Sequence, residues 1–348
     1  MSPEAAVLGW DLGGAHLKVV RWSNARGVEG ALQLPCPLWR GEPHLEAAVA
    51  EALERLGAGV ALHALTMTGE LVDLYPGRAE GVRRLVALMA GRLPTESLRV
   101  YAGPEGFLAP AAAVVRTRLV ASANWHASAA LAARRLPAGL LVDVGSTTSD
   151  LLPFAGGAVL ARGYTDHERQ ARGELIYAGV ARTPVMALCR EAPVGGEWTG
   201  LAAEHFATTA DVYRLTGELP EGADQHPAAD GGDKSRAGSR RRLARMVGLD
   251  GEDAGAEAWD GLAAYLRGRQ LDRLEQACGR LLSRGELAPD APLVGAGTGR
   301  FLVRRLAGRL ERPWVDFETL LPLGGAGAAA SDCAPAAAVA VLATLEAA

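Results

Sequence analysis

Apolar and polar positions follow one another along this chain in short blocks of two kinds. Residues 44–56 and 81–93 carry apolar side chains every three to four positions, which predicts two amphipathic helices. The alanine-rich stretch 119–134 predicts one further helix, and the longest amphipathic pattern covers 259–282. Continuous apolar runs, such as 60–68 and 98–101, predict buried strands.

Two strand-like runs end in an aspartate followed by a tight polar turn. Residues 141–150 read L-V-D-V-G-S-T-T-S-D, and the apolar residues 151–154 then return as a strand. Residues 7–20 have the same order, with Asp11 and Gly13 at the turn. Such hairpins offer backbone N–H groups and hydroxyls to an anion, and carboxylates to a metal ion. The turn at 143–150, taken alone, is equally consistent with an ordinary polar hairpin.

A third turn is rich in glycine. Residues 295–299 read G-A-G-T-G between an apolar run and a helix-like stretch at 300–304. Glycines in such a place let the backbone approach a ligand closely. A P-loop is excluded because no G-x-x-x-x-G-K-[ST] motif occurs and the two hairpins return as strands.

Together, the two Asp-x-Gly hairpins, about 130 residues apart, and the late glycine turn resemble the actin-like ATPase superfamily. That superfamily includes sugar kinases, acetate kinase and the large ATP-dependent heat-shock chaperones. The resemblance implies an α/β fold of two actin-like domains around a central cleft, with one hairpin in each domain. The expected domains are residues 1–135 plus 334–348, and residues 136–333.

Composition narrows the class of protein. The 348 residues are enough for two domains, and 49% hydrophobic with 22% charged residues is typical of a globular chain. A net charge of −4 and 5% aromatic residues give no general affinity for nucleic acid or acidic membranes. We therefore expect small-molecule substrates, no nucleic acid or membrane partner, and a monomer or homodimer.

The expected location is the cytoplasm. The four cysteines are scattered without C-x-x-C spacing, which indicates neither a zinc site nor a disulfide framework. The first residues lack the basic segment of a signal peptide. The most apolar stretch, 324–348, is interrupted by polar residues and proline, so it predicts a buried helix and not a membrane span.

Two polar segments stand out. The first, 164–183, is the densest polar block in the chain and is either an exposed charged face or part of a site. The second, 220–239, has almost no large apolar residue and predicts a disordered loop or a lid that orders over substrate. The arginines that follow at 240–245 could hold an anionic substrate, although solvated surface arginines are commoner.

Seven segments together resemble one family: the hydantoinase A/oxoprolinase-related proteins of tetrahydromethanopterin-linked one-carbon metabolism. The segments are 9–18, 66–73, 122–129, 143–150, 165–185, 207–217 and 294–299. Archaeal members are similar to the synthase that joins the furan and tyramine–glutamate halves of methanofuran. One departure concerns the A-D-G at 229–231, which is followed here by Gly232, Asp233 and Lys234 where a threonine-containing turn is expected.

The resemblance implies a transferase of methanofuran or methylofuran biosynthesis. The phenol oxygen of glutamyl-tyramine, or of a related phenol, displaces diphosphate from a furan methyl diphosphate and forms an aryl ether. The expected diphosphate-binding residues are Gly13, Gly14, His16, Lys18, Gly145, Ser146, Thr147, Thr148, Gly297 and Thr298. The expected substrate-binding residues are Thr68, Asn124, Arg169, Thr183, Asp211 and Arg242.

The expected reaction also requires a metal ion and a general base. The turns bring Asp11, Asp143 and Asp150 towards a diphosphate, and two like charges 4 Å apart cost roughly 4 kcal/mol at a dielectric near 20. We therefore expect Mg²⁺ at these three carboxylates. The phenol needs a general base. Candidates are Asp166, Glu70, Glu168 and Glu174, and Asp166 is favoured because it follows the second hairpin by one strand.

Two other functions use the same turns. An ATP-dependent small-molecule kinase, or a hydantoinase/oxoprolinase-like hydrolase, would place adenine at the glycine turn and require ATP. A filament-forming or chaperone-like member of the superfamily would polymerise or bind peptides, and it gives no reason for the polar block at 164–183.

Overall fold

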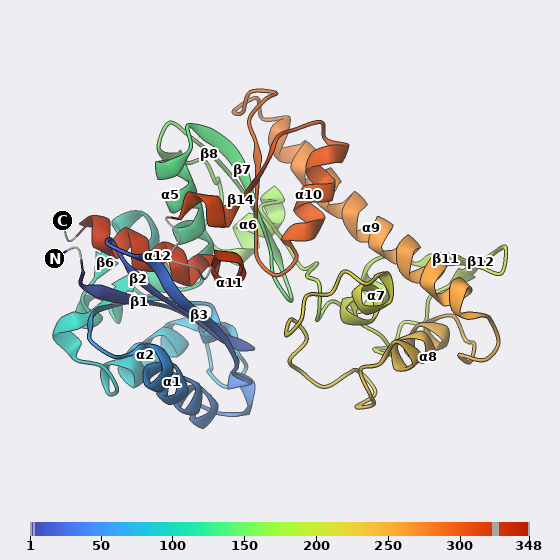
Figure 1. Cartoon of the computed structure of the whole chain (residues 1–348), viewed down its shortest axis with the longest axis horizontal. Coiled ribbons are helices and arrows are strands. Elements are labelled where there is room, and N and C mark those ends of the chain that lie inside the picture. The colour runs from blue at the N-terminus through green and yellow to red at the C-terminus, as the bar shows by residue number, and fades with distance from the viewer. Residues whose placement is uncertain (1, 3, 322–326, 347–348) are drawn as a thin grey trace. The chain divides into compact units, whose positions relative to one another are not determined.

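The computed structural model describes residue 2, residues 4–321 and residues 327–346 (Figure 1). Contacts within the chain divide it into two compact units. Unit 1 consists of residues 1–139, 153–161 and 315–348, and unit 2 of residues 140–152 and 162–314. One Asp-x-Gly hairpin turn lies in each unit.

The chain mixes strands and helices along its length. The strands are β1 (Ala6–Leu12), β2 (His16–Ser23), β3 (Gly27–Pro35), β4 (Val60–Met67), β5 (Leu98–Tyr101), β6 (Phe107–Leu108), β7 (Ala138–Val144), β8 (Ser149–Ala155), β9 (Ala158–Val159), β10 (Leu175–Ile176), β11 (Glu191–Val194), β12 (Glu197–Gly200), β13 (Leu293–Ala296) and β14 (Trp314–Asp316). The α-helices are α1 (Pro43–Leu56), α2 (Arg78–Ala90), α3 (Pro110–Ala113), α4 (Thr117–Val120), α5 (Asn124–Arg135), α6 (Asp166–Arg172), α7 (Thr209–Thr216), α8 (Arg236–Met246), α9 (Ala256–Leu282), α10 (Arg300–Arg309), α11 (Gly327–Asp332) and α12 (Ala334–Glu346).

The sheet of unit 1 has the strand order β3-β2-β1-β4-β5-β6. Strand β1 pairs antiparallel with β2 and parallel with β4, so the first hairpin and the end of β4 lie at one edge of the sheet. In this register Asp11 lies opposite Lys18 on β2 and opposite Thr66 on β4. The carboxyl ends of parallel strands are the usual place for a ligand in α/β proteins.

Helix α12 packs on β1, β2, β4 and α5, whereas α1 and α2 lie on the other side of the sheet (Figure 1). The side chains from Ala334 to Thr344 are all buried, as the apolar pattern predicted. A Cβ on Gly9 of β1 would lie 1.9 Å from the carbonyl oxygen of Ala336, so only glycine permits this approach. Residues 324–326 and 347–348 of the predicted C-terminal helix lie outside the described residues.

The second sheet has the order β10-β8-β7-β13-β14, with β9 also paired to β8. Strand β13 runs parallel to β7, with Ala296 opposite Asp143. The glycine turn after β13 and the polar turn after β7 therefore leave the same edge of the sheet. The placement of the second hairpin and of the glycine turn confirms their predicted strands.

A separate apolar cluster joins α7, α8 and α9 within unit 2. It includes the fully buried Trp259, with Val212 from α7 and Leu243 from α8. The hairpin of β11 and β12 forms a two-stranded sheet next to α9. This cluster holds the three helices together.

Most predicted helices are confirmed: 44–56 by α1, most of 81–93 by α2, and 259–282 by α9. The single helix predicted over 119–134 is wrong, because α4 ends at Val120 and α5 begins at Asn124. Between them Ser122 has φ = +52°, a left-handed conformation that a helix cannot continue. Its hydroxyl donates to Oε1 of Glu70 at 2.8 Å, which stabilises the break.

The loop predicted over 220–239 ends earlier than expected. Helix α8 begins at Arg236, and the hydroxyl of Ser235 caps it by accepting the N–H of Gly238 at 3.0 Å. All four cysteines are free thiols. Within the described residues, no helix has both the length and the apolarity needed to cross a bilayer.

Candidate active site

The polar turn of the second hairpin is closed by its own backbone. The N–H of Gly145 donates to the carbonyl oxygen of Thr148 at 2.9 Å. Ser146 and Thr147 stand at the tip, and all four residues are half-buried. A turn of this kind directs its N–H groups to one side, where an anion can bind.

A neighbouring segment occupies the carbonyl groups of this turn. The N–H groups of residues 179–182 donate to the carbonyl oxygens of Thr147 (3.0 Å), Gly145 (3.0 Å) and Ser146 (3.1 and 2.8 Å). In the described part of the chain, the N–H groups of Ser146, Thr147 and Thr148 donate to no acceptor. The carbonyl oxygens of the turn are therefore hydrogen-bonded, and its N–H groups are available to a ligand.

We call residues 178–183 the brace, because N–H groups of this segment hold the turn. The brace is itself held by buried side chains. Gln270, fully buried on α9, donates its Nε2 to the carbonyl oxygens of Ala178 (2.9 Å) and Gly179 (3.1 Å). Its Oε1 accepts the hydroxyl of Tyr213 at 2.8 Å. The hydroxyl of Thr183 accepts the N–H of Gly179 at 2.8 Å. Thr183, which was predicted to bind substrate, thus belongs to the brace and holds Gly179 in place.

The glycine turn after β13 packs directly against the hairpin. A Cβ on Gly297, whose φ is +79°, would lie 2.3 Å from both Oδ1 of Asp143 and the carbonyl oxygen of Val144. The N–H of Gly299 donates to that same carbonyl at 2.8 Å. Thr298 is buried, and its Oγ1 has no hydrogen-bond partner among the described residues. The glycines are explained by this contact, and the orphaned hydroxyl suits a ligand oxygen.

The first hairpin repeats this geometry in unit 1. The N–H of Gly13 donates to the carbonyl oxygen of His16 at 3.0 Å. The carbonyl oxygens of Gly14 and Ala15 accept N–H groups from the segment 36–38 at 3.0 and 2.9 Å. Within the described residues, the N–H groups of Gly14 and Ala15 donate to no acceptor. Both turns therefore have braced carbonyls and outward N–H groups.

The predicted residues around the first hairpin fall at one edge of the sheet. The N–H of Thr68 donates to the carbonyl oxygen of Leu12 at 2.9 Å. Glu70 follows in a short turn and is buried, with its Oε1 held by Ser122. Asn124 begins α5 and accepts the N–H of Trp125 at its own Oδ1. The structure therefore brings Asp11, Lys18, Thr68 and Glu70 to the same edge.

The first part of the polar block, 164–174, consists of helix α6 and the residues that cap it. Thr165 and Glu168 form a capping box at the start of α6, with Oε2 of Glu168 accepting the N–H groups of Tyr164 and Thr165. These backbone hydrogen bonds lower the pKa of the Glu168 carboxyl. Asp166, the first residue of α6, is buried. Glu168 is thus committed to the fold.

Two more predicted residues are engaged in the same region. Glu174 is fully buried and accepts the N–H groups of Arg162 (2.8 Å) and Gly163 (2.9 Å), and it pairs with Arg284 at 2.8 Å. Arg169, also buried, donates to Oδ1 of Asp150. Asp150, predicted as a metal ligand, therefore already compensates a buried cation.

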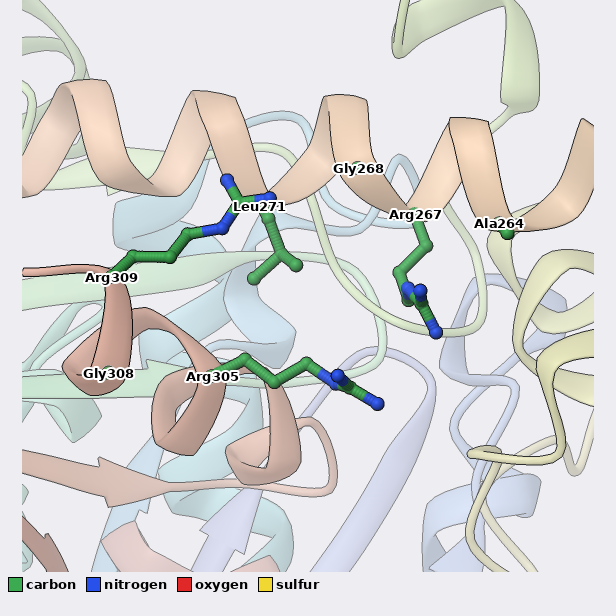
Figure 2. A pocket seen from close by; sticks show the side chains of 7 residues that line it. All are labelled: Ala264, Arg267, Gly268, Leu271, Arg305, Gly308 and Arg309. Carbon is green, nitrogen blue, oxygen red and sulfur yellow. The ribbon is translucent and has the colours of Figure 1, made fainter.

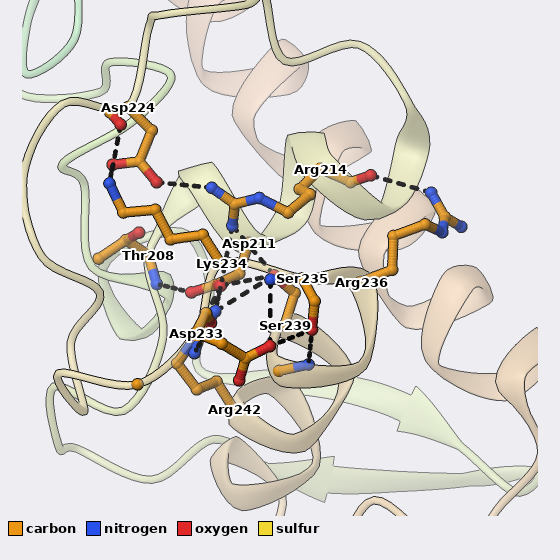
Figure 3. Close-up of polar contacts among 12 residues, drawn as sticks. Thr208, Asp211, Arg214, Asp224, Asp233, Lys234, Ser235, Arg236, Ser239 and Arg242 are labelled. Carbon is orange, nitrogen blue, oxygen red and sulfur yellow. Dashed lines mark hydrogen bonds and ion pairs between the residues drawn. The ribbon is translucent and has the colours of Figure 1, made fainter.

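A buried ionic network ties the 220–235 loop to α7 and α8 (Figure 3). Arg242, fully buried on α8, pairs with Asp211 at 2.7 Å and with Asp230 of the loop at 3.1 Å. Arg214 pairs with Asp224 of the loop, with Nη2 and Oδ2 2.5 Å apart. The predicted substrate ligands Asp211 and Arg242 satisfy one another in this state. The ordering of the loop by substrate stays a prediction.

Mg²⁺ at Asp11, Asp143 and Asp150 stays a prediction. Among the described residues, no group of three or more His, Cys, Asp or Glu side chains forms a metal cluster. Magnesium commonly binds through one or two carboxylates together with phosphate oxygens. Asp11 and Asp143 each supply one carboxylate beside an outward-facing N–H turn, which is consistent with such a site.

Some functional candidates were missed by sequence patterns. Gln270 is a polar residue on the apolar face of α9, between Leu266 and Leu274, and this irregularity is the signal that could have found it. Gly179 and Arg182 lie within a polar block that gave no indication of contact with the turn. Arg182 lies next to the turn, because its N–H donates to the carbonyl oxygen of Ser146. Its side chain is exposed.

Comparisons with known proteins agree with the family that the sequence motifs resemble. The family model described as hydantoinase/oxoprolinase matches residues 62–315. A protein of Methanocaldococcus jannaschii named "(4-{4-[2-(gamma-L-glutamylamino)ethyl]phenoxymethyl}furan-2-yl)methanamine synthase" is 29% identical over 296 residues, which cover 84% of this chain and 86% of that protein. The Methanococcus vannielii protein of the same name is 32% identical over 111 residues, 32% of this chain and 50% of that protein.

Solved structures share the fold at low sequence identity. The activator of 2-hydroxyisocaproyl-CoA dehydratase from Clostridium difficile has a TM-score of 0.50 at 11% identity, covering 98% of this chain and 95% of that chain. A nucleotide-free acetone carboxylase structure has a TM-score of 0.51 at 12% identity, covering 85% and 66%. The fold is therefore the α/β actin-like fold of two domains.

Proposed function

The chain belongs to the hydantoinase/oxoprolinase family, and we propose that it is a transferase that makes the aryl ether of methanofuran or methylofuran. The substrates are a furan methyl diphosphate and the phenol of glutamyl-tyramine or a related amine. Diphosphate is the second product. The name of the Methanocaldococcus relative, which describes a phenoxymethyl furan, supports this choice.

The observation that carries the proposal is the state of the 145–148 turn. Its carbonyl groups are held by residues 179–182, and its N–H groups face outward without acceptors in the described chain. A diphosphate leaving group needs such donors, because its negative charge grows as the carbon–oxygen bond breaks. The orphaned Oγ1 of Thr298 offers a further donor beside the turn.

The reaction exchanges one carbon–oxygen bond for another. The bond from the furan methylene carbon to diphosphate breaks, and the bonding pair leaves with the diphosphate. The phenol oxygen forms the new bond, and its proton passes to a carboxylate. The furan ring delocalises positive charge on the methylene carbon, so stabilisation of the leaving group is the main task of the protein.

Among the predicted bases, we assign proton removal to Asp166. Both oxygens of Glu174 accept backbone N–H groups, and Arg284 adds an ion pair. Glu168 caps α6 through its Oε2. Glu70 is held by Ser122. Asp166 follows the hairpin in unit 2, one helical turn from the Arg169 that pairs with Asp150.

Magnesium belongs to the proposal as a partner of the diphosphate. Asp143 would hold it beside the second turn, and Asp11 occupies the equivalent place beside the first. The bound ion would neutralise charge on the diphosphate oxygens. Asp150 takes no such role in the proposal, because Arg169 already engages it.

The test is a reconstitution with and without ATP. The full chain, the furan methyl diphosphate, tyramine or glutamyl-tyramine and Mg²⁺ should yield diphosphate and the ether in equal amounts without nucleotide. Asp166→Asn should lower kcat more than it raises KM, because proton removal matters only in the transition state. Glu168→Gln is the matched control, since it removes a carboxylate from the same helix without removing the proposed base.

A strict requirement for ATP, with ADP formed in proportion to product, would replace the proposal with a kinase or hydrolase. The assignment of Asp166 as the base is contradicted if Glu168→Gln and Asp166→Asn lose kcat equally, because the loss would then reflect the helix and not proton transfer.

A further inference from the structure

A cavity of about 490 Å³ lies between α9 and α10 (Figure 2). Its lining consists of Ala264, Arg267, Gly268, Leu271, Arg305, Gly308 and Arg309. This volume falls within the range of small-molecule sites. We propose that the cavity binds a small oxyanion, a phosphate monoester or a dicarboxylate, as a second ligand site of this protein.

The charges of the lining favour an anion. Three of its residues are arginines, and none of the lining residues is acidic. Arg267 and Arg305 both pair with Glu218, at 2.9 and 2.7 Å, so two guanidinium groups share one carboxylate. Figure 2 shows these two side chains converging from α9 and α10. One positive charge is left over at Glu218, whereas Arg309 faces two carboxylates, Asp272 and Glu275.

The arginines keep donors available after their ion pairs are made. Arg267 uses Nη1 for Glu218, and Arg309 uses Nη1 for Asp272 and Glu275. Within the described residues, Nη2 and Nε of both side chains have no acceptor. A guanidinium fork fits carboxylate and phosphate oxygens in pairs. The chemistry of the cavity therefore selects oxyanions.

The position of Glu218 holds Arg267 and Arg305 in place before a ligand binds. Its N–H donates to the carbonyl oxygen of Tyr213 at 2.9 Å, beyond the end of α7. Burial acts to raise the pKa of the Glu218 carboxyl, but hydrogen bonds with Arg267, Thr216 and Arg305 outweigh it and hold that pKa low. An ionised Glu218 holds the two arginines side by side, so a ligand need not order them.

Two glycines keep the cavity open. Gly268 lies in the middle of α9 and Gly308 near the end of α10, where glycine is less favourable than alanine. A Cβ at either position would meet no atom within 4 Å, and both have helical backbone, so neither packing nor a turn requires glycine there. Side chains at these two positions would occupy the space between the arginines.

The cavity is distinct from the anion turn of the proposed function. Helix α10 begins at Arg300, directly after the glycine turn, and Arg305 to Arg309 lie roughly 8–14 Å further along its axis. The inference therefore does not depend on the transferase proposal.

The experiment measures binding to the full chain by titration calorimetry at low salt, with glycerol 3-phosphate in one arm and glutarate in the other. At least one probe should bind, and the stronger arm identifies the phosphate or the dicarboxylate source. Arg305→Gln should weaken that binding at least tenfold. Arg92→Gln, which breaks an exposed ion pair with Glu46 in unit 1, is the matched control and should change nothing.

Filling the cavity separates binding from folding. Gly308→Leu should abolish binding while the melting temperature stays level or rises, because leucine favours helix. Gly279→Leu is its control, since Gly279 lies in α9 with no atom near its Cβ and outside the lining. Gly179→Ala, which disturbs the anion turn, should leave the affinity unchanged. The proposal is overturned if neither probe binds, or if Gly308→Leu and Gly279→Leu bind equally.

Discussion

Gly179 donates its backbone N–H to the carbonyl oxygen of Thr147 at 3.0 Å, and no larger residue fits at that contact. A Cβ on Gly179 would lie 2.3 Å from the carbonyl carbon of Ser146 and 2.4 Å from the nitrogen of Thr147. The outward direction of the turn's N–H groups therefore depends on a segment that follows it by about 30 residues.

Gly179→Ala should displace the turn and remove anion binding. Because backbone atoms stand in the way, the turn or the 178–182 segment must shift. We expect kcat/KM for the diphosphate substrate to fall at least about 100-fold, since oriented donors of this kind contribute on that scale. Gly279→Ala, with no atom near its Cβ, should keep wild-type activity. Equal activity of the two variants would contradict a role for the brace.

Gln270→Leu should weaken the same site from a distance. The substitution leaves the carbonyl oxygen of Gly179 and the hydroxyl of Tyr213 without a buried partner, whereas the carbonyl oxygen of Ala178 keeps the hydroxyl of Ser149 at 2.8 Å. The expected cost is about 1–3 kcal/mol of unfolding free energy. Tyr213→Phe removes one bond and should cost about 1 kcal/mol. Urea unfolding gives both values. The KM of the diphosphate substrate should rise in Gln270→Leu more than in Tyr213→Phe; the reverse order would contradict the brace.

The hairpins were predictable because their pattern is local. Asp143 and Gly145 stand two residues apart, and the strand, turn and return all lie within 15 residues of sequence. The brace was not predictable in this way. Gln270 meets Ala178 across 92 residues, and Gly179 carries no side chain whose character could indicate a contact. Long-range hydrogen bonds of the backbone leave almost no trace in sequence periodicity.

Asp143→Asn should remove activity without unfolding the protein. The side chain keeps its shape beside Gly297 but loses its charge, so metal-bound diphosphate loses a ligand. Turnover should fall at least about 100-fold, and higher Mg²⁺ should recover part of it. The melting temperature should move little. Normal turnover at low Mg²⁺ would exclude the metal role; Asp290→Asn, on an exposed turn, is the control.

Asp211→Ala should destabilise the region around the 220–235 loop. It removes the main partner of the fully buried Arg242, and an uncompensated buried charge costs about 3 kcal/mol or more. Asp260→Ala is the control, because Asp260 pairs with partly exposed Arg236 and Arg240 and should cost less than about 1 kcal/mol. Chemical unfolding measures both, and equal losses would show that Arg242 is compensated by Asp230 alone.

The role of Asp211 and Arg242 shows a second limit of sequence patterns. Both residues stand in polar stretches that suit a substrate site equally well. In the structure they pair with each other, because the capping box at Thr208 orients Asp211 and Arg242 lies on the buried side of α8. Whether a charge faces a ligand or a partner is decided by such packing, which no spacing rule contains.

Stability should fall as the medium is acidified below pH 6.5. Burial lowers the pKa of His63 to about 4, and its Nδ1 accepts the indole N–H of Trp10 at 3.3 Å. The neutral form is therefore the folded form, and its contribution is complete above the unfolded pKa of 6.5 and is lost as pH falls towards 4. By pH 5 the loss should be about 2 kcal/mol.

His63→Gln provides the check, because an amide oxygen can still accept the indole N–H but does not titrate. Urea unfolding between pH 5 and pH 8 should give a shallower decline for this variant, by about 2 kcal/mol. The buried His126 titrates in both proteins and cancels in the comparison. Parallel pH profiles would assign the acid sensitivity to other groups.

The contact of Gly9 with Ala336 sets an order of assembly during protein synthesis. Strands β1, β2 and β4 emerge from the ribosome before α12, which covers them and begins only at Ala334. At about 5–20 residues per second, tens of seconds separate the two. During that time one face of the newly made sheet is not covered by α12, while unit 2 can already fold. Conditions that slow elongation should therefore favour aggregation of the nascent chain through that face.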